Sequence, residues 1–124
     1  MIFVAPKLLV AEDEEILRML IVDTLEDDDY EIDEAEDGAE AYDYIQSKAY
    51  DLVLLDYMMP EMTGLEVIKK VREQGNHDVK IMMLTAKAQK KDEEIAREAG
   101  TDYFISKPFS PVELANVVGD ILGE

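Results

Sequence analysis

The chain has 124 residues, 48% of them hydrophobic, a size and composition that suit one domain with one core. Thirty acidic residues against twelve basic ones give a formal net charge of −18, which disfavours direct contact with the phosphate backbone of a nucleic acid. The opening residues lack the features of a secretory signal, and no run of about 18 apolar residues could span a membrane. Cysteine is absent, which excludes disulfides and makes a cytoplasmic location the expectation. The length predicts a single domain over residues 1–124.

Five alternations of a strand and a helix are predicted along the chain. Short apolar runs that end at polar residues predict the strands, and apolar residues at helical spacing predict the helices between them. The expected strands cover residues 7–11, 30–35, 52–55, 80–84 and 103–105. The expected helices cover residues 16–25, 37–45, 65–71, 89–99 and 111–122.

Capping residues support several of these boundaries. Asp37 with Glu40 forms a predicted capping box at the start of the second helix, and Ser110 with Glu113 does the same for the last. Gly100 follows the fourth helix, where glycine is a favoured terminator. Strands that alternate with helices predict a parallel sheet covered on both faces. Such sheets bind ligands beyond the carboxyl ends of their strands.

Polar side chains follow four of the predicted strands at the point where each strand ends. They are Glu12 and Asp13, then Asp56, then Thr85, then Lys107. Because the ends of parallel strands share one edge of the sheet, these side chains should meet in one cleft. Carboxylates about 4 Å apart repel each other by about 4 kcal/mol near a protein surface. A lysine and a hard divalent cation would offset that repulsion, which predicts a metal-dependent phosphate site.

Four segments carry a family resemblance when they are taken in order and at their spacing. They are LLVAEDE (8–14), DLVLLDYMMPEMTG (51–64), LTA (84–86) and FISKPF (104–109). On these segments the chain resembles the receiver domains of two-component response regulators over essentially its whole length. The resemblance implies an α/β, doubly wound, flavodoxin-like fold with a five-stranded parallel sheet in the order 2-1-3-4-5 and five helices.

The same resemblance implies a Mg²⁺ site, with Mn²⁺ as an alternative ion. The carboxylates of Asp13 and Asp56 and the backbone carbonyl of Met58 would be ligands, and Glu12 would act through a bound water molecule. Glu12 replaces the aspartate that is commoner in the family. Its longer side chain is expected to shift the metal geometry slightly.

Asp56 would be the phosphoacceptor by this resemblance. It would attack a phosphohistidine of a partner kinase, or a small acyl phosphate, while Lys107 neutralises charge. Thr85 and the backbone amide of Ala86 would bind a phosphoryl oxygen. The chain is therefore expected to be a phosphoacceptor signalling protein that promotes its own phosphotransfer and slow autodephosphorylation, rather than a classical enzyme.

The expected switch couples Thr85 to Phe104, and it moves the fourth helix and the fifth strand. Phe104 lacks a hydroxyl, so its positions would differ by packing alone, and core packing explains this aromatic equally well. By the same resemblance, Met58 and Lys87 stand at positions that tune dephosphorylation in the family, and here they predict a long-lived phosphorylated state. Family knowledge also predicts a cis peptide at Lys107-Pro108.

The expected partners are a sensor histidine kinase or phosphotransfer protein and an unidentified output protein. With no output domain apparent, the signal would pass through the fourth helix, fifth strand and fifth helix. Lys87, Lys90 and Lys91 form a basic cluster there, although a solvated helix start explains them equally well.

Other classes of protein remain for comparison. A phosphatase of the haloacid dehalogenase type is disfavoured, because it needs an acid where Met58 stands. A flavodoxin-like electron carrier is disfavoured, because the acidic residues 12–15 would repel the phosphate of its cofactor. The alternative that stays open is a receiver-fold binding module that works without phosphorylation.

Overall fold

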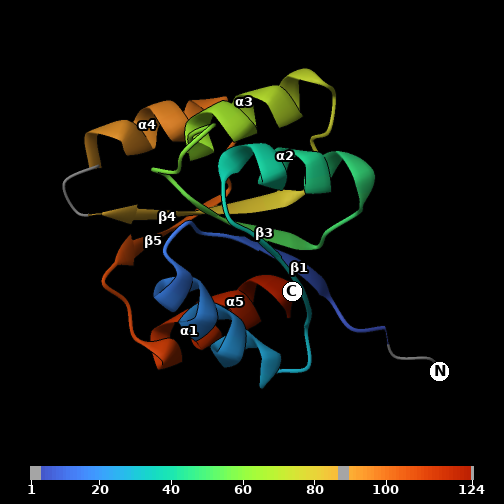
Figure 1. The fold of residues 1–124 in the computed structure, drawn as a ribbon, viewed down its shortest axis with the longest axis vertical. Coiled ribbons are helices and arrows are strands. Elements are labelled where there is room, and N and C mark those ends of the chain that lie inside the picture. Colours follow the sequence, from blue (N-terminus) through green and yellow to red (C-terminus); the bar gives the residue numbers. More distant parts are fainter. Residues whose placement is uncertain (1–3, 87–89, 124) are drawn as a thin grey trace.

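The computed structural model describes residues 4–86 and 90–123, and for Lys90 the backbone alone. Five strands alternate with five helices in this part of the chain, as predicted (Figure 1). The strands are β1 (Lys7–Ala11), β2 (Glu31–Ala35), β3 (Leu52–Asp56), β4 (Lys80–Ala86) and β5 (Tyr103–Lys107). The helices are α1 (Glu15–Glu26), α2 (Gly38–Ser47), α3 (Gly64–Glu73), α4 (Lys90–Ala99) and α5 (Pro111–Leu122).

The sheet is parallel throughout, with the order β2-β1-β3-β4-β5. This confirms the strand order that the family resemblance implied. The central strands β1 and β3 carry uninterrupted apolar runs because both of their faces are buried. β2 lies at one edge, and its exposed acidic residues suit a strand that is paired on one side only.

Helices cover both faces of the sheet, which separates the core into two layers. α2, α3 and α4 pack on one face, and α1 and α5 pack on the other (Figure 1). Successive strand residues point to opposite faces, so Leu9, Val53 and Ile81 enter the first layer, whereas Leu8 and Leu52 enter the second. Within the described residues, no helix is long and apolar enough to cross a membrane.

Three strands extend further than their apolar runs suggested. Asp56, Thr85 and Lys107 each belong to a strand, because their backbones remain within the parallel ladder. In the ladder Thr85 lies opposite Ser106 and Ala86 lies opposite Lys107. These three polar residues therefore stand on regular strand backbone, whereas Glu12 and Asp13 follow the end of β1. The chain then turns at Lys107-Pro108, where the predicted cis peptide is confirmed.

The helix caps differ from the prediction, because Asp37 and Ser110 each accept from the amide three residues later without forming a complete capping box. Asp37 accepts a hydrogen bond from the Glu40 amide at 2.8 Å, as an N-cap should. The Glu40 carboxylate, however, accepts from the Glu36 amide, one residue before the cap. A complete capping box occurs instead at Thr63 and Glu66, at the start of α3. This box anchors the loop that leads away from β3.

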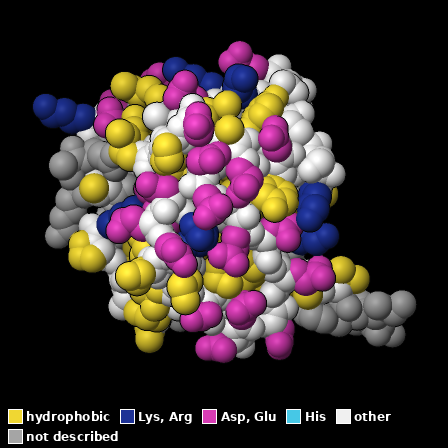
Figure 2. Space-filling model, in the orientation of Figure 1, with side chains coloured by type: hydrophobic (Ala, Val, Ile, Leu, Met, Phe, Trp, Pro, Cys, Tyr) yellow, Lys and Arg dark blue, Asp and Glu magenta, His cyan; other side chains and the backbone are white. Residues whose placement is uncertain are grey.

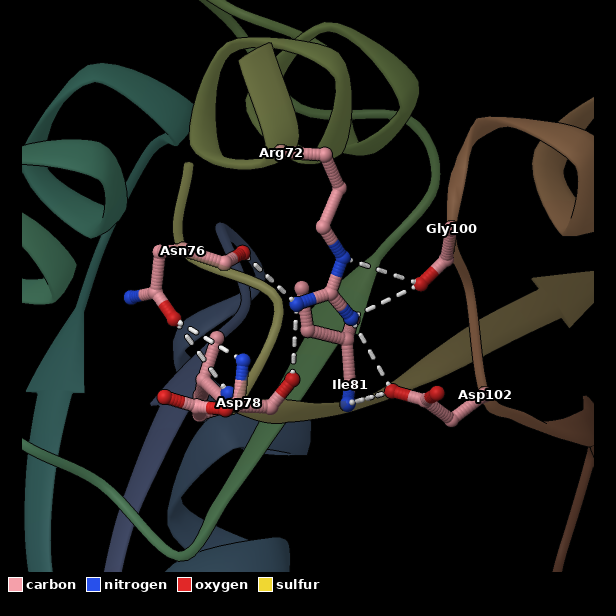
Figure 3. A network of polar contacts seen from close by, with 7 residues as sticks. Arg72, Asn76, Asp78, Ile81, Gly100 and Asp102 are labelled. Atoms are coloured by element: carbon pink, nitrogen blue, oxygen red, sulfur yellow. Dashed lines mark hydrogen bonds and ion pairs between the residues drawn. The ribbon is translucent and has the colours of Figure 1, made fainter. Parts of the chain in front are cut away.

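Arg72 ties together the opposite, amino-terminal edge of the sheet (Figure 3). Its guanidinium donates two hydrogen bonds to the carbonyl of Gly100, at 3.2 and 2.8 Å. It also donates to the carbonyls of Asn76 and Val79 and pairs with Asp102 at 3.0 Å. One side chain of α3 thereby fixes the end of α4 and the starts of β4 and β5.

Candidate functional site

The carboxyl ends of β1, β3 and β5 bring three charged residues into contact. The Nζ atom of Lys107 lies 3.0 Å from Oδ1 of Asp56 and 3.2 Å from Oε1 of Glu12. Asp56 and Lys107 are the last residues of β3 and β5, and Glu12 directly follows β1, so their convergence follows from the parallel topology. The structure thus places together the side chains that the strand ends indicated.

Three carboxylates cluster at this edge, and two of them are paired with Lys107. One oxygen atom each from Glu12, Asp13 and Asp56 lies within 4.8 Å of the others. Glu12 and Asp56 are buried, whereas Asp13 is exposed. Oxygen ligands in this number suit a hard divalent cation such as Mg²⁺, which keeps several waters and binds through one or two carboxylates. The donor set therefore fits the ion that the family resemblance implies.

Burial and mutual repulsion shape the ionisation of this cluster. The pKa of Glu12 is raised to about 7, mainly because burial disfavours its charged form, with the charge of Asp56 adding to the effect. The Glu14 amide and Lys107 oppose that rise. For Lys107, burial works against the ammonium, but Asp56 and Glu12 outweigh it and raise its pKa. Lys107 therefore stays cationic at neutral pH, and Glu12 is the acid that would respond to a bound cation.

Glu12 is held by its backbone as well as by its side chain. Its amide donates to the carbonyl of Ala35 at 3.1 Å, and its carboxylate accepts from the amide of Glu14 at 3.0 Å. Its carbonyl accepts from Nη1 of Arg18 at 2.8 Å. These bonds explain how a fully buried acid is tolerated at the end of β1.

Arg18 was missed by the sequence analysis, although a signal for it exists. It precedes Ile21, Val22 and Leu25 by three, four and seven positions, which places it on the buried face of α1. A charged residue at that spacing indicates a partner inside the fold. The identity of its partners could not be read from the sequence, because they lie on other elements.

Thr85 lies at the same edge of the sheet with its hydroxyl unused. Its side chain is 1% exposed, and Oγ1 has no hydrogen-bond partner within the described residues. The hydroxyl of Thr101 is also unpaired there, so an orphaned hydroxyl alone does not identify a site. What distinguishes Thr85 is its place on β4, one residue beyond Leu84, which is paired with Asp56. Ala86 ends the same strand.

The remaining candidates are Met58, Phe104 and the lysines at positions 87, 90 and 91. Met58 lies in the loop after β3 with its side chain 59% exposed. Phe104 is half-buried on β5, and the guanidinium carbon of Arg97 lies 4.7 Å from the centre of its ring. Lys87 falls outside the described residues, as does the side chain of Lys90, whereas Lys91 is exposed.

Comparison with known proteins identifies the family. The model of the response regulator receiver domain matches residues 8–119. The transcriptional regulatory protein ResD of Bacillus subtilis is 46% identical over 108 residues, which are 87% of this chain and 44% of ResD. DltR of Streptococcus agalactiae is 44% identical over the same share of this chain and 48% of its own length. The chain thus spans less than half the length of these relatives.

Solved structures agree with this result. The chemotaxis response regulator CheY4 of Vibrio cholerae has a TM-score of 0.88 and 31% identity, over 95% of this chain and 99% of CheY4. The receiver domain of sensor histidine kinase PA1611 from Pseudomonas aeruginosa has a TM-score of 0.87 and 28% identity, over 98% of this chain and all of that one. That structure holds a magnesium ion in its active-site cleft. The chain belongs to the response regulator receiver domain family of two-component systems.

Proposed function

We propose that this receiver domain is a signalling switch that takes a phosphoryl group on the carboxylate of Asp56. The observation that carries the proposal is the contact of Lys107 with both Asp56 and Glu12 at the edge of the sheet. A carboxylate oxygen of Asp56 attacks phosphorus and forms a P–O bond. The P–N bond of a phosphohistidine, or the P–O bond of an acyl phosphate, breaks in the same step, and the donor leaves with the bonding electron pair. Solvent supplies the proton to a departing imidazole.

Mg²⁺, or Mn²⁺ in its place, is the proposed cofactor. Asp13, Asp56 and the backbone carbonyl of Met58 would hold the ion directly, and Glu12 would hold it through water. The support is the set of three clustered carboxylates and the magnesium site of the PA1611 receiver domain. When bound, the ion neutralises charge on the transferring group.

Residues of β4 and β5 are proposed to receive the phosphoryl oxygens. Lys107 already lies 3.0 Å from Asp56 and would move from the carboxylate to the phosphoryl group. The buried hydroxyl of Thr85 would gain the partner that it lacks, and the amide of Ala86 would donate a further hydrogen bond. No general acid or base is required, because phosphoryl transfer depends mainly on positioning and on charge neutralisation.

The proposed output runs through α4, β5 and α5. A phosphoryl group adds nearly two negative charges, and it would draw Thr85 inward and let Phe104 repack. Ala96 is the one described α4 residue with a fully buried side chain, which indicates a helix held weakly to the sheet. Phe104 joins this helix to β5 through its contact with Arg97. The basic cluster of Lys87, Lys90 and Lys91 belongs to the same surface in this proposal.

The phosphodonor is proposed to be a protein that docks on α1. Ile16, Met19 and Leu20 are 85%, 53% and 42% exposed, an uncommon run of apolar side chains on an acidic surface. A pocket of about 470 Å³ lies beside them, lined by Leu17, Leu20, Lys107, Pro108 and Phe109. Because Lys107 is shared by this pocket and the carboxylate cluster, a donor seated there would reach Asp56. A sensor histidine kinase or a phosphotransfer protein fits this role.

The lifetime of the phosphorylated state is proposed to be long. The exposed side chain of Met58 is apolar and offers no group to orient an attacking water molecule. Lys87 is proposed to help hold a phosphoryl oxygen. Loss of the phosphoryl group from the purified protein would be followed by ³¹P NMR; loss within minutes, without a phosphatase, would contradict this part of the proposal.

The domain is also proposed to act alone in the cytoplasm, without contact to nucleic acid. The net charge of −18 supports the proposed lack of contact with nucleic acid. ResD and DltR are named transcriptional regulatory proteins and are more than twice the matched length, so an output on the same chain is the competing possibility. The intact mass of the native protein from its own cells would decide between the two.

Trapping the phosphorylated residue tests the proposed chemistry. The protein would be incubated with acetyl phosphate and Mg²⁺ and then reduced with borohydride, which converts an aspartyl phosphate to homoserine. Peptide mass spectrometry should place the homoserine at position 56, and chelation of the metal should prevent it. The rival is a binding module that works without phosphorylation, and absence of homoserine in the presence of metal would favour it.

A further inference from the structure

Arg18 of α1 is a buried arginine next to the proposed metal centre. Its side chain is 10% exposed, and it is the only basic residue among the buried polar residues of the described chain. Removing a guanidinium from water is unfavourable unless its charge and its donors are satisfied. Its partners therefore show what the burial achieves.

The guanidinium of Arg18 contacts three acceptors at the carboxyl ends of β1 and β2. Nη1 donates to the carbonyl of Glu12 at 2.8 Å, and Nε donates to Oε1 of Glu34 at 3.1 Å. Nη2 lies 3.7 Å from Oε1 of Glu36. Arg18 thereby fastens α1 to the ends of two strands, one of which delivers Glu12 to the carboxylate cluster.

The effect of Arg18 on this cluster is geometric more than electrostatic. Its positive charge is offset by the carboxylates of Glu34 and Glu36. The carbonyl that it binds belongs to the planar peptide group that joins Glu12 to Asp13. Because the amide of Glu12 is already bonded to Ala35, the contact with Arg18 fixes the peptide on the other side. Fixing this peptide also fixes the orientation of the backbone at Asp13.

We propose that Arg18 is a positioning residue for the metal centre. It holds the peptide between Glu12 and Asp13 so that the carboxylates of Glu12, Asp13 and Asp56 stay within reach of one divalent cation. This inference rests on the proposed function, because it assumes that a divalent cation binds at the cluster of Glu12, Asp13 and Asp56. A lysine at position 18 would keep the charge but lose the rigid fork that reaches three acceptors at once.

The test compares Arg18→Lys with Arg72→Lys. Arg72 is a matched control, because its side chain is 11% exposed and its guanidinium bonds to several acceptors at the opposite edge of the sheet. Mn²⁺ binding would be titrated by electron paramagnetic resonance, and the thermal unfolding of the metal-free proteins would be recorded beside it. Arg18→Lys should raise the Kd for Mn²⁺ about 10-fold, the lower end of the effect of residues that support metal ligands. Arg72→Lys should lose stability and keep the Kd of the wild type.

Three results would overturn the inference. The first is a wild-type Kd in Arg18→Lys, and the second is an equal rise of the Kd in Arg72→Lys, which would tie the effect to general stability. The third is a rise that disappears in high salt, because a charge effect is screened there and a positioning effect is not. Failure of the proposed function is a separate outcome, because the wild type itself would then bind no Mn²⁺.

A second pair of variants serves if Arg18→Lys does not fold. Glu34→Gln keeps Arg18 in place but weakens one of its anchors, and Glu31→Gln removes the same charge from the far end of β2. A larger rise of the Kd for Mn²⁺ in Glu34→Gln than in Glu31→Gln supports the inference, and equal values overturn it.

Discussion

Lys107 and Asp56 form an ion pair of 3.0 Å that joins an edge strand of the sheet to its centre. The same ammonium lies 3.2 Å from Glu12, so one lysine neutralises part of the repulsion between two buried acids. In this arrangement the lysine and a metal ion share the task of balancing the carboxylates.

Removal of Lys107 should make the stability of the folded protein depend more strongly on a divalent cation. Lys107→Ala is expected to destabilise the metal-free protein by about 2 kcal/mol, less than the roughly 3 to 5 kcal/mol for a fully buried pair. The reduction reflects the 23% exposure of the Lys107 side chain. Mg²⁺ should then raise the melting temperature of this variant more than that of the wild type, because an ion that binds the native state more tightly stabilises it more. Calorimetry measures both effects, and Lys69→Ala, an exposed lysine of α3, is the control. An equal rise of the melting temperature with Mg²⁺ in all three proteins would contradict the idea that Lys107 and the metal ion both balance the carboxylates.

Gly38 sets the position of the loop that follows Asp56. A Cβ atom at this residue would come far too close to the carbonyl oxygen of Met62. Gly38→Ala should therefore push the loop aside and lower the free energy of unfolding by about 1 to 3 kcal/mol. It should also weaken Mg²⁺ binding, because Met58 stands in the same loop. Gly119→Ala is the control, since its Cβ would meet open space within α5 and should stabilise by about 1 kcal/mol. Denaturant unfolding that ranks these two variants the other way would refute this account.

The pair of Tyr50 and Asp33 predicts a pH dependence of stability. The hydroxyl of Tyr50 donates to Oδ2 of Asp33 at 2.6 Å, and this bond lowers the pKa of Asp33, with Lys48 assisting. Because the pKa is lower in the folded state, the stabilisation is complete above the ordinary value of 3.8 and is lost as the pH falls below it. Tyr50→Phe should cost about 1.5 kcal/mol near neutral pH, which is typical of a hydrogen bond to a charged group.

The cost of Tyr50→Phe should shrink when the pH is lowered through the range where Asp33 takes up its proton. Urea unfolding of the wild type and the variant at a series of pH values measures this difference. Tyr103→Phe removes the same hydroxyl from a half-buried tyrosine on β5 and controls for the loss of the group itself. A difference between wild type and Tyr50→Phe that stays constant down to the lowest pH would show that Asp33 is not the partner that matters.

Salt should stabilise the protein. Acidic side chains cover much of the face in Figure 2, in keeping with thirty acidic and twelve basic residues. Their repulsion acts over about 10 Å at 0.1 M salt and only about 3 Å at 1 M, so added NaCl or KCl should raise the melting temperature. The rise should weaken near pH 4, where carboxylates take up protons. A melting temperature that falls with either salt would contradict this prediction.

Some features of the fold follow from short-range patterns, and these could be predicted. The alternation of strands and helices gave the parallel sheet, and the polar residues at the strand ends indicated that Asp56 and Lys107 would meet. Three of the strands run further than predicted, because apolar runs mark where a strand is buried and not where its ladder ends. Asp56, Thr85 and Lys107 keep ladder positions despite their polarity.

Other features depend on contacts between distant elements and could not be predicted. The raised pKa of Glu12 reflects complete burial beside Asp56, which no local pattern encodes. Arg18 meets its partners only after β2 has been placed beside β1. The capping box at Thr63 was readable in principle, since a glutamate follows three positions later. Pro60 shortly before Thr63 and Gly64 directly after it are typical of a loop, and they hide this helix start.

The most direct test of the account is the intact mass of the wild type and of Asp56→Asn after incubation with acetyl phosphate and Mg²⁺. The wild type should gain the mass of one phosphoryl group, and the variant should gain none, because the amide cannot act as the nucleophile. A wild type that gains no mass, or a variant that gains as much as the wild type, would contradict the assignment of Asp56 as the phosphoacceptor.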